Sequence, residues 1–280
     1  MNLRYGTTDV AMPMPKWGYE CKISLPLIIE KLSSGNGYAI WDNGANGANY
    51  DIRTLKCEWF LSLTDTNTLI DLFRNSAKGR AGNITIKLGV SASGFFPFGP
   101  DKGDAGDFVT RLISIDPKPS IGHPADYFNV ECEFVHVGSY PVYVIPDANI
   151  DGSLQIGTIN QLRYPQPMHD QKISYGVHTV ITHNASAYAN DSTSTADEYE
   201  AIMNMGQTQA NAARLIYHLC KTVRASTVDI IPPANSYLFG RENASTATYT
   251  CQWPQNEISI TNPQFGQFDF SLNFYRVSQA

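Results

Sequence analysis

The chain has 280 residues, of which 42% are hydrophobic and only 16% are charged, below the average of about 25% for soluble proteins. Its net charge of −6 is shared equally by residues 1–150 and 151–280, and no basic patch is visible, which argues against a protein that grips nucleic acid through its phosphates. The 11% of aromatic residues argue against disorder, and no apolar run approaches the roughly 18 residues that span a bilayer. We therefore expect a folded, β-rich protein with no membrane segment.

The first half of the sequence predicts an arm followed by an α+β domain. Residues 1–17 are interrupted by proline and methionine and are interpreted as an arm. The Asn/Gly-rich stretch 42–51 suits the tip of a projecting hairpin, and Thr64 and Asp65 suit the start of an amphipathic helix. Strands are predicted at residues 19–25, 38–41, 55–63, 84–88, 108–113 and 128–137, with a Gly/Pro/Asp loop at 94–107.

The second half predicts the same order of elements. A hairpin is expected around the Asn/Ser-rich loop 184–194, and a helix is expected near residues 207–223. Strands are predicted at residues 177–182, 198–205, 228–231, 249–253 and 268–276. The predicted organisation is an N-terminal arm (1–17), a first domain (18–145), a linker (146–170) and a second domain (171–280).

Short segments recur between the two halves at nearly constant spacing. Phe98-Gly99 returns as Phe239-Gly240 at a spacing of 141 residues. The closing segment 128–137 matches 268–277 at a spacing of 140, and 57–63 matches 199–205 at 142. Few positions are identical, but several segments in the same order at nearly one spacing indicate an internal repeat. We expect two tandem copies of one small α+β domain that is mainly β, with one helix each.

No combination of residues predicts catalysis. The histidines are scattered, no nucleophile elbow is present, and Glu58 and Glu131 are expected to point outward from their strands. The loop 101–107 is expected to be a solvated turn, with a cation site as the alternative. The five cysteines form no paired motif, which indicates a reducing compartment; Cys57, Cys132 and Cys251 fall in strands and are expected to be buried. We predict no enzymatic activity, no cofactor and no metal site.

One arrangement in the second half resembles a known family. A strand and a helix are followed by IIPPANSYLFG (230–240) and by the aromatic closing strand FDFSLNFYRV (268–277). This order resembles the lambda-like distal tail proteins of long-tailed phages, minor tail proteins built on the tail-tube fold, in which the strand after the helix commonly runs into a Pro-Pro segment. The first half has the Phe-Gly element in SGFFPFGPD (93–101) but lacks the Pro-Pro. The likeness covers residues 18–137 and 171–278.

The resemblance implies two tail-tube-like β-sandwich or barrel domains in tandem. Because the family closes six tube domains into a ring, a chain with two copies implies a homotrimer with pseudo-sixfold symmetry. It further implies a virion protein made in the cytoplasm of a bacterial host, with the tail tube protein and tail tip or hub proteins as its other partners. DNA would pass through the lumen without specific binding. With about 24 strands, the backbone of such a ring would be on the order of 40–50 Å across.

The two Asn-rich loops occupy equivalent places in the repeat and are the predicted contacts to neighbouring subunits or to the next ring. Small and amide-bearing residues permit close backbone approach and adaptable hydrogen bonding. The candidate assembly residues are Asp42, Asn43, Asn46, Asn49, Tyr50, Asn184, Tyr188, Asn190 and Asp191.

Other functions stay open from the sequence. The duplicated fold also suits a major tail tube protein, which stacks many rings. A carbohydrate-binding β-sandwich for host attachment would need exposed aromatic residues on one face, whereas Trp41, Trp59 and Trp253 fall in predicted strands and only Trp17 lies outside them. A cell-wall hydrolase would need a nucleophile or a metal set that the sequence does not provide.

Overall fold

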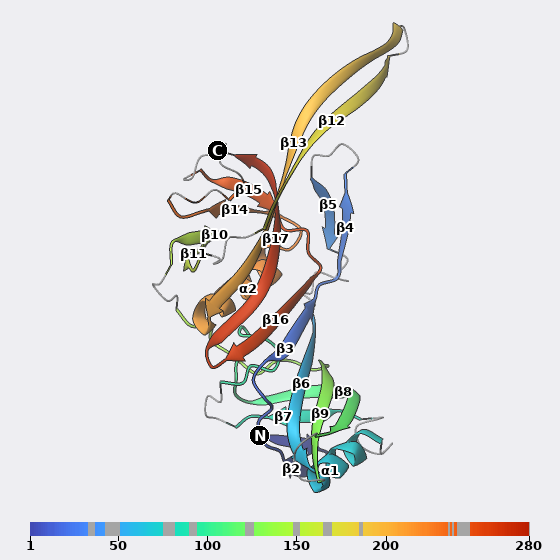
Figure 1. Cartoon of the computed structure of the whole chain (residues 1–280), viewed down its shortest axis with the longest axis vertical. Coiled ribbons are helices and arrows are strands. Elements are labelled where there is room, and N and C mark those ends of the chain that lie inside the picture. The colour runs from blue at the N-terminus through green and yellow to red at the C-terminus, as the bar shows by residue number, and fades with distance from the viewer. Residues whose placement is uncertain are drawn as a thin grey trace.

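The computed structural model describes residues 1–32, 37–42, 51–74, 82–89, 94–120, 126–147, 152–164, 170–184, 187–234, 236, 238–239 and 247–279. Strands make up 53% of the chain and helices 13%, so the expected mainly β, α+β class is confirmed. The molecule is elongated, with the first half at one end, the second half above it and a long hairpin projecting beyond the second half (Figure 1). No helix in the described ranges is long and apolar enough to cross a membrane.

The first half is an antiparallel sheet that folds around one helix, α1. Ser62 starts α1 by accepting a hydrogen bond from the backbone N–H of Asp65 at 3.2 Å, as an N-cap does, and Leu69 and Leu72 are buried on the inner side of the helix. The strands pair in the order β2-β1-β7-β8-β9-β6-β3. Their bounds are β1 (Asn2–Tyr5), β2 (Thr8–Ala11), β3 (Tyr19–Ser24), β6 (Ile52–Ser62), α1 (Leu63–Arg74), β7 (Ile84–Lys87), β8 (Asp107–Pro119) and β9 (Tyr127–His136).

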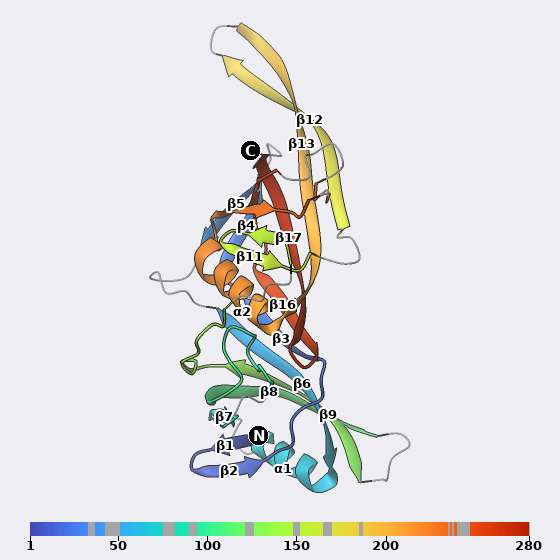
Figure 2. The ribbon, with the colours of Figure 1, turned by 90° about the vertical axis from the view of Figure 1, so that its left-hand side faces the viewer.

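The second half has the same strand order, β11-β10-β14-β15-β17-β13-β12. Its helix α2 packs against β11, β13 and β17 and continues into a short π-helical turn, η2, so that the helix expected near residues 207–223 is confirmed (Figure 2). The bounds are β10 (Leu154–Ile156), β11 (Ile159–Leu162), β12 (Asp170–Asn184), β13 (Ala187–Thr208), α2 (Gln209–His218), η2 (Leu219–Val223), β14 (Thr227–Ile231), β15 (Tyr249–Gln252), β16 (Glu257–Gln264) and β17 (Gln267–Gln279).

One strand of the second half, β16, was not predicted, and it joins the two halves. In the first half the long strand β8 follows β9 along most of its length. In the second half the corresponding position is divided: β15 pairs with the end of β17, and β16 pairs with its beginning. The other edge of β16 pairs with β3 of the first half over Glu257–Asn262. The result is one continuous run of eight strands, β12-β13-β17-β16-β3-β6-β9-β8.

The prediction that strands 38–41 and 55–63 form a hairpin is wrong. β5 (Tyr38–Asp42) pairs instead with β4 (Leu27–Lys31) as a separate two-stranded sheet. Ile29 and Ile40 pack against the core of the second half, and the backbone of Tyr38 exchanges hydrogen bonds of 2.7 Å with the side chain of Gln252. The position of β5 is thus set by its apolar contacts with the second half and by its hydrogen bonds to Gln252, not by its local sequence pattern.

The second predicted hairpin is present but differs in its bounds. Residues expected to form the loop 184–194 are mostly strand, because β12 and β13 stay paired as far as Asn184 and Ala187. β13 pairs with β17 only over Glu200–Thr208, so most of the hairpin extends beyond the body of the molecule.

The arm and the linker predicted from the sequence both contain strands. β1 and β2 form a hairpin that pairs with β7, and β10 and β11 form one that pairs with β14. The two turns carry Gly6 at φ +57° and Gly157 at φ +58°, a left-handed conformation in which glycine has no steric penalty. All four strands are only three or four residues long, too short to give a clear alternating pattern, which is why the sequence did not predict them.

The core has two clusters, one per half, that meet at the junction. Equivalent aromatic pairs lie in both: the rings of Phe98 and Phe108 are 5.7 Å apart, and those of Phe239 and Tyr249 are 5.0 Å apart. Five cysteines are buried and free, including Cys57, Cys132 and Cys251 as expected. Cys21 and Ile23 of β3 belong to the core cluster of the second half, so β3 contributes to both halves of the molecule.

We expect Phe134→Ala and Phe274→Ala to destabilise the protein equally, by about 3–5 kcal/mol, because each removes a fully buried ring at the corresponding position of β9 or β17. Phe265→Ala is the matched control, since that ring is 73% exposed and its loss should change little. Chemical denaturation monitored by tryptophan fluorescence gives the free energy of unfolding. A large loss in only one of the two core variants would contradict their equivalence.

Candidate functional site

The most distinctive surface of the molecule is one face of the eight-stranded run, which we call the polar face. Along each strand of the run, the residues on this face alternate with residues that are buried in the core, as in a sheet that packs on the core with one face and meets solvent with the other. The polar face comprises Glu20, Lys22, Ser24, Thr54, Lys56, Glu58, Ser114, Asp116, Lys118, Asn129, Glu131, Glu133, Glu200, Ile202, Asn204, Glu257, Ser259, Thr261, Asp269, Ser271 and Asn273.

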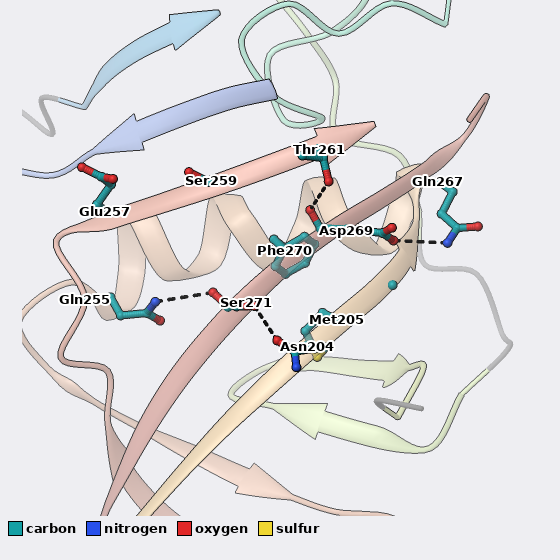
Figure 3. A pocket seen from close by; sticks show the side chains of 11 residues that line it. Asn204, Met205, Gln255, Glu257, Ser259, Thr261, Gln267, Asp269, Phe270 and Ser271 are labelled. Atoms are coloured by element: carbon teal, nitrogen blue, oxygen red, sulfur yellow. Dashed lines mark hydrogen bonds between the residues drawn. The ribbon is translucent and has the colours of Figure 1, made fainter. Parts of the chain in front are cut away.

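Cross-strand polar contacts cover the second half of this face. The Ser271 hydroxyl donates to Asn204 Oδ1 at 2.6 Å (Figure 3). The Asn273 side-chain amide donates to Glu200 Oε1, also at 2.6 Å. An open depression of about 630 Å³ lies over β13, β16 and β17, lined mostly by amide, hydroxyl and carboxylate groups. This half therefore presents a hydrated surface of small polar side chains.

The first half of the polar face is held by lysine–carboxylate pairs. Lys56 lies 3.0 Å from Glu131, and Lys16, from the segment before β3, lies 2.5 Å from Glu58. At the junction Lys22 on β3 lies 2.7 Å from Glu257 on β16. All six side chains are about half exposed, so these ion pairs orient the side chains but contribute little to the stability of the fold.

Carboxylates outnumber lysines on the polar face. Its carboxylates are Glu20, Glu58, Asp116, Glu131, Glu133, Glu200, Glu257 and Asp269, whereas its lysines are Lys22, Lys56 and Lys118. The summed field of such a surface is negative, which lowers the local concentration of anions such as phosphate.

Glu58 and Glu131 do face outward, as expected. They lie directly opposite each other on β6 and β9, and each is engaged by a lysine. Of the tryptophans, Trp59 and Trp253 are fully buried, whereas Trp17 and Trp41 are about half exposed. Trp17 packs edge-to-face on the exposed ring of Phe265, with 6.2 Å between centroids.

Both ends of the eight-stranded run are open edges. At one end β12 pairs only with β13, and at the other the outer part of β8 beyond Thr110 pairs only with β9, among the residues that the structure describes. Open edges expose unpaired backbone N–H and C=O groups and are templates for pairing with another chain.

The candidate assembly residues fall in two places. Asp42 ends β5, whereas Asn43, Asn46, Asn49 and Tyr50 lie outside the described residues. Asn184 ends β12 opposite Ala187, and Asn190 and Asp191 on β13 pair with Thr182 and Ile181, with Tyr188 close by in sequence. The second set is thus gathered at the far end of the projecting hairpin.

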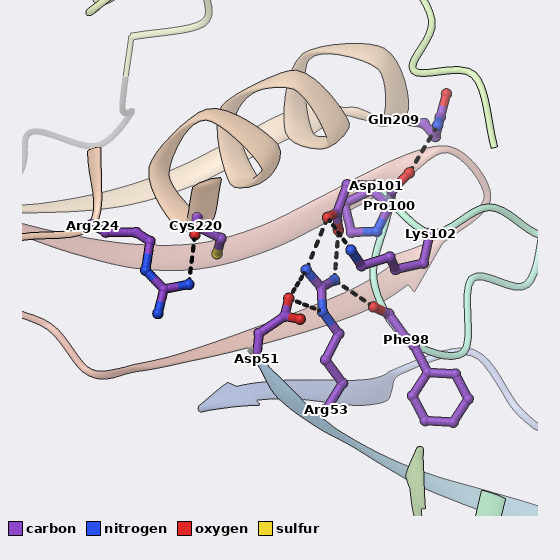
Figure 4. A network of polar contacts seen from close by, with 9 residues as sticks. All are labelled: Asp51, Arg53, Phe98, Pro100, Asp101, Lys102, Gln209, Cys220 and Arg224. Carbon is purple, nitrogen blue, oxygen red and sulfur yellow. Dashed lines mark hydrogen bonds and ion pairs between the residues drawn. The ribbon is translucent and has the colours of Figure 1, made fainter. Parts of the chain in front are cut away.

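The loop expected to be a solvated turn is buried instead. Asp101 accepts two hydrogen bonds from Arg53, of 2.6 and 2.8 Å (Figure 4). Asp104 accepts a hydrogen bond from the backbone N–H of Gly94 at 2.9 Å. Arg53 also binds Asp51 at 2.6 Å and the Phe98 carbonyl at 2.6 Å. No group of three or more metal-ligating side chains occurs within the described ranges.

Arg53 is the charge around which this loop folds. Burial alone would lower the pKa of its guanidinium, but Asp101 and Asp51 outweigh burial and raise that pKa well above its ordinary value. Burial likewise opposes ionisation of Asp51, and the nearby charges of Arg53 and Lys102 outweigh it, so the pKa of Asp51 is lowered. Arg53 and Asp51 are therefore both charged at neutral pH, and each neutralises the other.

The two open strand edges were not predicted from the sequence, although the sequence carries a signal for one of them. Lys22-Ile23-Ser24 on β3 recurs as Lys172-Ile173-Ser174 on β12, 150 residues later. That spacing lies outside the 140–142 range of the other matches, because insertions between the segments differ in the two halves.

We expect Arg53→Met to destabilise the protein by about 3–5 kcal/mol, because it leaves two buried carboxylates without their cation. Arg4→Met is the matched control: it also breaks an arginine–aspartate pair, with Asp9, but on the exposed surface, and should have little effect. Urea denaturation of both variants measures the difference. Equal losses would show that the buried network contributes no more than a surface pair.

His136 should make the stability of the protein depend on pH. Burial, together with the charge of Arg53, lowers the pKa of its imidazole from 6.5 to about 4, and its ring stacks on Tyr140 at 3.8 Å. The unfolded chain therefore binds a proton before the folded one does, so stability falls as the pH drops from about 6.5 to about 4. His136→Phe should flatten this part of the curve of unfolding free energy against pH. An NMR titration of His136 with a midpoint near 6.5 would contradict the prediction.

The chain was also compared with known proteins. No family model matches it, and no curated protein is similar enough to it to indicate a family.

Proposed function

We propose that the protein is a structural protein of a siphophage virion: a distal tail protein that forms a trimeric, pseudo-hexameric ring and connects the tail tube to the tail tip or hub. The observation that carries the proposal is the identical strand order of the two halves, each folded around one helix. It supports an internal duplication of a tail-tube-like domain, and with it the resemblance noted in the sequence.

The eight-stranded run supports the ring. Three chains would supply about 24 strands, and at roughly 4.8 Å between strands and tilts near 45° a closed barrel would be on the order of 50 Å across. Side chains would still leave room for duplex DNA. Closure would also remove the open edges of β8 and β12, which a lone chain leaves unprotected.

The polar face supports a lumen. It is hydrated and acidic, so it would line a conduit without retaining phosphates. The opposite face packs on the core and on the helices, and the projecting β12–β13 hairpin would reach a neighbouring subunit or the next ring.

The major tail tube protein is a second candidate, because the same ring could stack. The length of the β12–β13 hairpin favours contacts along an axis, which both roles need. For a carbohydrate-binding module, the favourable observation is the exposed pair of Trp17 and Phe265. Electron microscopy separates the first two: single rings at tail tips for a distal tail protein, and long tubes for a tube protein.

We expect native mass spectrometry of the purified protein to give three times the 31.0 kDa chain, and negative-stain images to show rings with sixfold appearance. DNA affinity at physiological salt should be no tighter than about 10⁻⁴ M, the weak non-specific level. A stable hexamer would place twelve domains where six are expected. That result, or tight and steeply salt-dependent DNA binding, would contradict the proposal.

A further inference from the structure

We propose that β8 of one chain pairs antiparallel with β12 of a second copy, in the register that β16 uses for β3 within a single chain. The inference rests on the proposed ring and names the strands, the residue pairs and the charges that close it. Each chain then carries the same contact twice, once internally and once with a neighbour.

The first step is that β16 and the outer part of β8 hold corresponding positions. Leu61 and Gln207 each lie two residues before a helix, and they pair with Phe128 and Phe268. Two residues further along β9 and β17, Val130 pairs with Pro117, and Phe270 pairs with Ile260. Pro117 of β8 therefore corresponds to Ile260 of β16, and Ile115 corresponds to Ile258.

The second step is that β12 corresponds to β3. Arg53 and Tyr199 each lie ten residues before the first residue of a helix, and they pair with Ile23 and Ile173. The correspondence is independently supported by sequence, because Lys-Ile-Ser occurs at residues 22–24 and again at 172–174. The register and the sequence thus give the same alignment.

The register between β16 and β3 can therefore be applied to β8 of one chain and β12 of another. β16 pairs with β3 as Ile258 with Ile23, Ser259 with Lys22 and Thr261 with Glu20. The corresponding pairs between two chains are Ile115–Ile173, Asp116–Lys172 and Lys118–Asp170.

Charge complementarity is an independent observation that agrees with this register. Both polar pairs of the transferred register join an acidic residue to a basic one. In a single chain Asp116 and Lys118 form an ion pair with each other at 2.8 Å, and both side chains are more than half exposed. A register shifted by one residue would place Asp116 opposite Gln171 or Ile173, and it would turn the apolar positions to the wrong face.

The backbone of the β8 edge sets the direction of hydrogen bonding. The Ser120 N–H donates to the Tyr127 carbonyl at 3.1 Å, so by alternation Ile115, Pro117 and Pro119 direct their backbone groups to the open edge. The two prolines have no N–H but keep their carbonyls as acceptors. Two β8 edges would therefore pair poorly with each other, whereas β12 can still donate to them.

Cysteine cross-linking tests the register. Asp116→Cys combined with Lys172→Cys should give disulfide-linked dimers and closed trimers under mild oxidation. These products must be intermolecular because the two strands end opposite sides of the run, and the five native cysteines are buried. The matched control, Lys118→Cys with Lys172→Cys, is displaced by two residues, about 7–8 Å away on the diagonal, and should cross-link at least about tenfold more slowly.

Charge exchange gives a second readout without oxidation. Asp116→Lys and Lys172→Asp should each weaken the trimer about tenfold, and the double variant should recover most of the loss. If the wild-type protein forms trimers but cross-linking is equal at both positions and charge reversal has no effect, the pairing is wrong and the ring stands. If the wild-type chain stays monomeric, the proposed ring itself fails, and the pairing fails with it.

Discussion

The pairing of β16 with β3 is the constraint on which the rest of the structure depends. It joins the sheet of the second half to that of the first over Glu257–Asn262 and makes one run of eight strands. Because Cys21 and Ile23 of β3 are buried in the core of the second half, this pairing also fuses the two cores. The halves share both backbone hydrogen bonds and apolar surface, and each places its helix on the side of the sheet away from the polar face.

A short interruption after β15 makes that pairing possible. In the first half β8 stays on β9 with one bulge, between Leu112 and Ser114. In the second half Trp253 is buried, and the Gln255 side chain accepts hydrogen bonds from the indole N–H at 2.7 Å and from the Asn273 backbone at 2.6 Å. These contacts fix the break, so that β16 leaves the line of β15 and presents its outer edge to β3. A short break between β15 and β16 thus allows the outer edge of β16 to pair with β3.

The difference between the halves is clearest at the position of Arg53 and Tyr199. In the first half Arg53 on β6 is neutralised by Asp51 and Asp101. At the corresponding place in the second half, Tyr199 on β13 lies under Arg276 of β17, with the guanidinium 3.4 Å from the ring centroid. A buried ion pair and a cation–π contact fill the same site, which explains why sequence identity is low where topology is shared.

The sequence by itself determined the mainly β class, the helix of each half, the buried cysteines and the outward direction of Glu58 and Glu131, because these follow from local periodicity. Only the tertiary structure decided that β5 pairs with β4, that β16 joins the halves and that Asp101 binds Arg53. Each of these joins residues far apart in the chain, through apolar surface or buried charge that no local pattern records. The short hairpins β1–β2 and β10–β11 were determined partly by each. The sequence shows that residues 3–7 and 154–158 share the pattern Leu-x-x-Gly-Thr. Only the pairing of the hairpins with β7 and β14 identifies these segments as strands.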